Sequence, residues 1–173
     1  MDDAAALTAQ IERPLRAPAD VAVRCHLGLP VVTRVPPLLD DGTPFPTRYW
    51  LSCPLAVRRI GRLEAAGGVK AMERRAARVP EFAAALEEAQ RRYAAERDAL
   101  VPEGTSLRPS GGVGGTTHGV KCLHAHYADH AVGNDNPIGA LVAPWVEPLD
   151  CDVPCVVERD GAVSRNSAWR EPR

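Results

Sequence analysis

The sequence has no long apolar run, no excess of one charge and few aromatic residues. No stretch approaches the roughly 18–20 apolar residues that a membrane span needs. Lys and Arg total 21 against 22 Asp and Glu, so the net charge of −1 favours neither nucleic acid nor an anionic membrane. Residues Met1–Gln10 lack the basic and apolar regions of a secretory signal. We therefore expect a cytoplasmic protein without nucleic-acid or membrane partners.

Hydrophobic residues make up 45% of the 173 residues and charged residues 25%, which is typical of a globular protein. The length suits one domain of ordinary size, which we expect over residues 1–157. Residues 158–173 are polar and unpatterned, so a disordered tail is expected there.

Alternation with a period of two predicts strands near the N-terminus, and helical signals dominate afterwards. The fold class predicted is α+β, with a small antiparallel sheet near the N-terminus packed on four or five helices. The predicted strands cover residues 21–26, 31–35 and 48–53, and the predicted helices cover 4–12, 54–66, 69–78, 80–100 and 117–132. A last ordered segment is expected at about 136–145.

Five cysteines in a chain without a secretory signal argue against a disulfide framework. The two close Cys/His pairs of a zinc finger are also missing, because only Cys151 and Cys155 form a close pair. Cys25 and Cys53 take inward strand positions, which suits either a core residue or a ligand. Metal binding, catalysis and burial therefore remain open for these thiols, and no role follows for Cys151 and Cys155.

The segment Cys122–His130 is the richest in imidazoles and carboxylates. On a helix, Cys122 and His126 share a face one turn apart, whereas His124 points toward the apolar edge. In an extended conformation, Cys122, His124 and His126 line one side. The alternatives are a solvated helix face, a hydrogen-bonded core histidine, or a Cys122 nucleophile with a histidine base.

A glycine-rich loop, Gly111–Thr117, precedes this segment and offers backbone N–H groups to an anion. Its order matches neither the phosphate-binding loop nor the dinucleotide fingerprint, and a flexible surface loop is the other interpretation. The candidate cofactor-binding residues are Gly112, Gly114, Gly115 and Lys121.

Several longer blocks together resemble a bacterial family of unknown function, the domain-of-unknown-function family numbered five hundred and one. The resemblance covers about Leu15 to Trp145 and implies no activity. Genes of that family often neighbour those for a septum-formation initiator and an exopolyphosphatase. The blocks are Arg24–Pro30, Asp41–Thr47 (Asp-Gly-Thr-Pro-Phe-Pro-Thr), Tyr49–Pro54, Leu63-Glu64, Val120–His126 (containing Lys-Cys-Leu-His) and Asn136–Gly139.

These blocks carry Cys25, Cys53, Cys122 and His124, so the resemblance strengthens the hypothesis that these residues share a metal site. The leading hypothesis is a zinc-binding protein whose ligands are Cys25, Cys53, Cys122 and one of His124 or His126. Three thiolates would make the site closed and structural. One alternative is a small enzyme, a hydrolase or a phosphoryl-handling one, that uses the glycine-rich loop and the Cys122–His130 segment. Another is a module that binds a protein partner linked to cell division.

Overall fold

The computed structural model describes residues 1–172, and a three-stranded antiparallel sheet lies at its centre. The strands are β1 (Asp20–Arg24), β2 (Pro30–Arg34) and β3 (Tyr49–Leu51), in that spatial order. Strand β2 pairs with both neighbours and is buried at every position except Arg34. The predicted small sheet near the N-terminus is confirmed.

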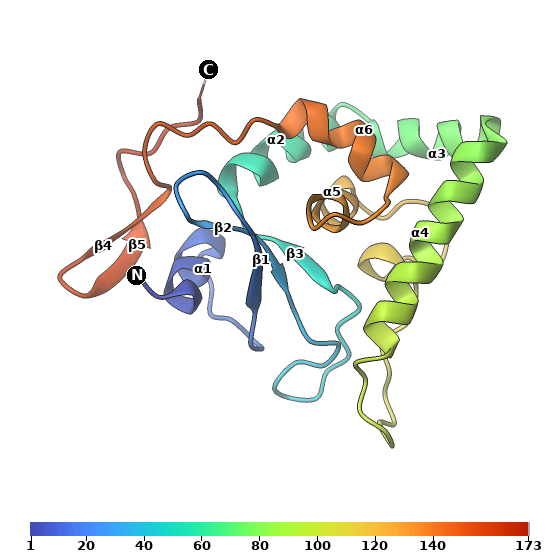
Figure 1. The fold of residues 1–173 in the computed structure, drawn as a ribbon, viewed down its shortest axis with the longest axis horizontal. Coiled ribbons are helices and arrows are strands. Elements are labelled where there is room, and N and C mark those ends of the chain that lie inside the picture. Colours follow the sequence, from blue (N-terminus) through green and yellow to red (C-terminus); the bar gives the residue numbers. More distant parts are fainter. Residues whose placement is uncertain (173) are drawn as a thin grey trace.

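Helix α1 (Asp3–Ile11) packs on β2 and helix α5 (Leu123–Ala131) packs on β3, so the molecule is α+β as predicted (Figure 1). Proline begins three of the helices, where its missing N–H costs no hydrogen bond. Within the described residues, no helix is both long and apolar enough to cross a membrane. The other helices are α2 (Pro54–Ala65), α3 (Gly68–Arg78), α4 (Pro80–Asp98) and α6 (Pro137–Val146), with a short 3₁₀ turn, η1, at Val113–Gly115.

Helix α5 occupies the middle of the helical part and packs on β3, α2 and α6. Figure 1 shows it almost end-on, between the sheet and α4. Its residues Leu123, Tyr127 and Ala128 are buried in the core. Helix α5 therefore lies between the sheet and the other helices, in contact with α2.

The observed start of α5 differs from the helix predicted over residues 117–132, because helical backbone begins only at Leu123. Gly119 has a positive φ of 66°, which interrupts a right-handed helix. Cys122 is extended, with φ −156° and ψ 150°, and precedes the helix as its N-cap residue. Cys122 and His126 therefore do not share a helix face.

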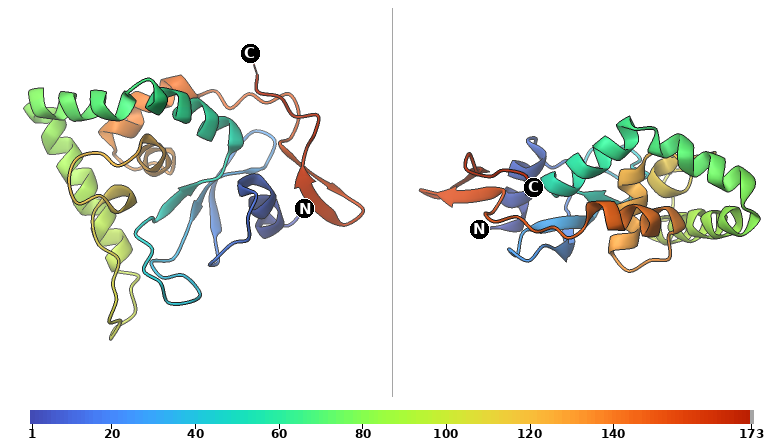
Figure 2. Two further views of the ribbon diagram at one scale, coloured as in Figure 1. Left: turned by 180° about the vertical axis from the view of Figure 1, so that it is seen from behind. Right: turned by 90° about the horizontal axis from the view of Figure 1, so that it is seen from above.

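Residues 158–173, expected to be a disordered tail, include ordered structure in the described part of the chain. Strands β4 (Val156–Arg159) and β5 (Ala162–Arg165) form a hairpin whose turn residues, Asp160 and Gly161, both have positive φ. Trp169 beyond it is only 7% exposed. The hairpin packs against α1, at the end of the molecule opposite α3 and α4 (Figure 2). Burial against α1 thus gives an otherwise polar segment its structure.

Candidate metal centre

The junction between the last turn of α2 and the start of α5 holds a cluster of three potential metal ligands. A carboxylate oxygen of Glu64 accepts a hydrogen bond from the backbone N–H of Leu123, over 2.6 Å. The same oxygen, Oε1, lies 3.1 Å from Nδ1 of His124. A carboxylate at a helix N-terminus satisfies an unpaired N–H and favours the helix dipole. These contacts fix both the carboxylate and the imidazole beside Cys122.

One ligand atom from each of Glu64, Cys122 and His124 lies within 4.8 Å of the other two, so this group can hold a metal ion. All three residues are partly buried. Burial raises the pKa of the Cys122 thiol, and backbone N–H groups of Ala125 and His124 lower it in part. A bound cation would favour the thiolate much more strongly. The other ring nitrogen of His124, Nε2, lies 3.2 Å from the Val57 carbonyl oxygen, so the imidazole is held at both ends.

The structure divides the set of metal ligands expected from the sequence. Cys122 and His124 belong to the Glu64 cluster, which is the one group of three or more potential ligands this close together among the described residues. Cys25 and Cys53 instead line a separate small cavity, together with Cys151 and Cys155.

His126 belongs to a buried polar network rather than to the Glu64 cluster. Its Nδ1 lies 3.1 Å from the Asn136 side-chain oxygen, and Asn136 donates to Asp129 over 2.8 Å. Arg92 of α4 forms an ion pair with the same carboxylate. Burial lowers the pKa of His126 to about 4, so the ring is neutral near pH 7. This network joins α4, α5 and the start of α6.

The glycine-rich loop packs against α4, and several of its backbone N–H groups form hydrogen bonds within the loop. Gly112 donates to Thr116, and Gly115 donates to Gly112, each over 2.8 Å. The Lys121 ammonium donates to the Gly114 carbonyl over 2.9 Å, so it too is engaged within the loop. Since α5 begins at Leu123, the loop does not lead directly into a helix N-terminus. Nothing in this arrangement adds support for anion binding at Gly112, Gly114, Gly115 and Lys121.

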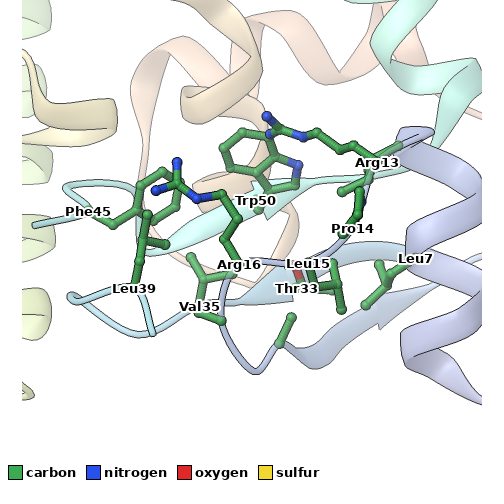
Figure 3. Close-up of a pocket in the computed structure, with 13 residues that line it drawn as sticks. Leu7, Arg13, Pro14, Leu15, Arg16, Thr33, Val35, Leu39, Phe45 and Trp50 are labelled. Atoms are coloured by element: carbon green, nitrogen blue, oxygen red, sulfur yellow. The ribbon is translucent and has the colours of Figure 1, made fainter. Parts of the chain in front are cut away.

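Sequence reasoning missed Glu64 as a ligand and also missed an apolar pocket between α1 and the sheet (Figure 3). Glu64 stood in a block shared with the resembling family, but the candidate ligands were cysteines and histidines, which zinc prefers. The pocket encloses about 100 Å³, and Phe45 and Trp50 form part of its wall. The Arg13 guanidinium lies 5.1 Å from the centre of the Trp50 ring. This pocket suits a small apolar group and offers no sulfur or imidazole to a metal.

The Glu64 cluster lies within the part of the chain that matches a protein-family model. A family model described as "Protein of unknown function (DUF501)" matches residues 21–144. This range includes Cys25, Cys53 and the whole Glu64 cluster, whereas Cys151 and Cys155 lie beyond it. No curated protein and no solved structure matches the chain. Because the match covers well over half of its residues, the chain belongs to the DUF501 family of proteins of unknown function.

Proposed function

We propose that this protein binds a zinc ion through Glu64, Cys122 and His124, and that the ion fastens the start of α5 to the end of α2. The observation that carries the proposal is the convergence of three different ligand types within 4.8 Å. Zinc accepts sulfur, nitrogen and oxygen ligands together, whereas magnesium and calcium prefer oxygen alone. The donor set therefore favours zinc.

This site would be open, unlike the closed site with three thiolates expected from the sequence. Three protein ligands leave the fourth tetrahedral position to a water molecule. The side chains of Glu64 and His124 are 25% and 27% exposed, so solvent reaches the junction. The position of the ligands favours a structural role, because Glu64 lies at the end of α2, Cys122 and His124 lie at the start of α5, and the two helices pack on each other.

The open fourth position favours a hydrolytic enzyme as a second candidate function. Zinc lowers the pKa of its bound water to about 7, which supplies hydroxide near neutral pH. Hydrolysis of an activated ester such as p-nitrophenyl acetate tests this candidate. We expect a zinc-dependent rate in the wild type that Cys122→Ser abolishes, and equal rates in both proteins would rule the candidate out.

The metal site itself is tested by the zinc content of the full chain, measured by elemental analysis without chelator. We expect Cys122→Ser to lose about one zinc ion per chain relative to the wild type, with a lower melting temperature. Glu64→Gln keeps an oxygen acceptor for the Leu123 N–H but is a poor zinc ligand, so it separates helix capping from metal binding. We expect it to lose the same ion.

His130→Asn serves as the matched control, since His130 lies on the same helix outside the cluster. It should retain all of the zinc. If Cys122→Ser and Glu64→Gln both retain the wild-type zinc content, the ion does not occupy this junction and the proposal is wrong.

A further inference from the structure

Four of the five cysteines meet at a second place, far from one another in the sequence. Cys25 directly follows β1, and Cys53 directly precedes α2. Cys151 and Cys155 lie in the segment that connects α6 to β4. All four line one cavity of about 10 Å³, whose other walls are mainly leucine and proline side chains. This volume is about that required by one water molecule, so the cavity suits a single small ion.

N–H groups donate to two of the four sulfur atoms. The Trp169 indole Nε1 donates to Cys151 Sγ over 3.3 Å, and the Gln10 amide donates to Cys155 Sγ over 3.5 Å. The backbone N–H groups of Leu55 and Ala56, in the first turn of α2, lower the pKa of the Cys53 thiol in part. Such donors stabilise thiolate more than thiol, and they are the usual outer partners of metal-bound cysteine.

Burial makes the charged form of these thiols unfavourable unless a cation accompanies it. It raises the pKa of Cys53 to about 11 and also raises that of Cys155. A divalent cation would offset the cost of burying these thiolates, because it replaces the thiol protons when it binds.

We propose that Cys25, Cys53, Cys151 and Cys155 bind a zinc ion of their own in a closed, structural site. Four sulfur ligands complete a tetrahedron and leave no position for water. In such a site, Zn–S bonds of about 2.3 Å bring the sulfur atoms to about 3.8 Å from one another. The described cysteines are more widely spaced, since no three of their sulfur atoms lie within 4.8 Å of one another. Binding of the ion therefore requires the four sulfur atoms to move closer together.

The ion would connect three parts of the fold, two of which are also joined by hydrogen bonds from Arg59 of α2 to the Val146 and Pro148 carbonyl oxygens. The three parts are the edge of the sheet, the start of α2 and the segment that leads to the C-terminal hairpin. The inference is independent of the Glu64 cluster, because the two sites share no residue.

The test compares zinc content in the reduced, full-length wild type, Cys151→Ser, Cys155→Ser and Cys122→Ser. We expect about two zinc ions per wild-type chain, with one lost in either Cys151→Ser or Cys155→Ser. Cys122→Ser is the matched control, because it changes the one cysteine outside the cluster. It should keep the cluster ion and lose only the ion at Glu64.

A second measurement is needed because serine in this cluster can also prevent folding. Zinc-edge X-ray absorption of Cys122→Ser examines the intact cluster. We expect a shell of four sulfur atoms at about 2.3 Å. A shell dominated by nitrogen or oxygen would overturn the inference.

The outcomes also separate the two sites. If Cys122→Ser removes all of the zinc, the four-cysteine inference fails and the Glu64 proposal stands. If Cys151→Ser removes all of the zinc while the fold survives, the reverse holds. Disulfides among the four cysteines in the wild type as purified under reducing conditions, found by alkylation and mass spectrometry, would overturn the inference as well.

Discussion

Tyr93 is a single side chain of α4 that joins the helical part of the molecule to the sheet. Its hydroxyl oxygen accepts hydrogen bonds from the backbone N–H groups of Arg48 and Tyr49, over 2.6 and 3.3 Å. The ring meets that of Tyr49 edge-on, with centroids 5.8 Å apart. Burial raises the pKa of Tyr93 to about 12. The hydroxyl group is therefore both a structural acceptor and a group that resists ionisation.

We expect Tyr93→Phe to lower the free energy of unfolding at pH 7 by about 1–3 kcal/mol, because two N–H groups lose their acceptor. The folded wild type keeps the hydroxyl proton between pH 10.0, the ordinary pKa, and about 12, whereas the unfolded chain releases it. Wild-type stability from this group is thus complete below pH 10 and decreases above it. Urea unfolding should show the difference between the two proteins shrinking above pH 10. A constant difference would contradict the assignment.

Residue types, together with the resemblance to a known family, supplied part of the candidate sites as hypotheses. Cys25, Cys53, Cys122 and His124 were all identified from the sequence as candidate ligands, and each now lies in one of two clusters. Their division between the clusters depends on the path of the chain. Cys53 and Glu64 stand at opposite ends of α2, about 16 Å apart along a helix of this length. No spacing rule reveals which thiol lies near which end.

The β4–β5 hairpin shows how one turn determines an element. Arg159 pairs with Ala162, so only Asp160 and Gly161 form the turn, and both have positive φ. This geometry is that of a type I′ turn, in which Asp-Gly is a preferred pair. The Asp-Gly signal, flanked by valines at 157 and 163, was therefore available in the sequence. The polar composition around it hid the signal.

Replacing two glycines by alanine should change the stability of the protein in opposite directions. Gly161, at φ +77°, and Gly61, inside α2, both have open space where a Cβ would lie. We expect Gly161→Ala to cost about 1–2 kcal/mol, because alanine resists the left-handed conformation. Gly61→Ala should instead stabilise the protein by about 0.5–1 kcal/mol, because alanine favours helix. Thermal unfolding measures both, and equal effects of one sign would contradict the turn geometry.

Helical signals located most elements but not the start of α5. The sequence pattern predicted helix from residue 117, yet the chain from Thr117 to Cys122 packs as irregular structure ahead of α5. The Glu64 carboxylate, which comes from another helix, accepts the first N–H of α5 and helps to fix its beginning. Gly119 is a local signal against helix in this stretch, whereas the contribution of Glu64 to the boundary leaves no trace in the neighbouring sequence.

At the scale of the whole molecule, residues near both termini lie together. The backbone amine of Met1 forms an ion pair with Glu158 over 2.9 Å, and α1 packs on the β4–β5 hairpin (Figure 1). Trp169 lies under the guanidinium groups of Arg58 and Arg165, at 4.9 and 5.8 Å from its ring centre. Residues after 157 thus complete the packing around α1 and α2.

A chain that stops at residue 157, where the sequence suggested that the domain ends, should be markedly less stable. It lacks the buried Trp169 ring and strand β5, which packs on α1. Loss of a buried tryptophan alone typically costs about 3–5 kcal/mol. Urea unfolding should show a decrease of at least about 3 kcal/mol, and cleavage by protease within α1 should become faster. Unchanged stability would mean that residues 1–157 form the complete folding unit.

The distance along the chain between Cys53 and Cys151 has a consequence for biosynthesis. The two cysteines are separated by 97 residues, which a ribosome adds in roughly 5–20 s. During that interval, the nascent polypeptide presents two thiols of the cluster before the other two exist. A metal captured at that stage could be held by only half of its final ligands, and full retention would have to await the emergence of Cys155.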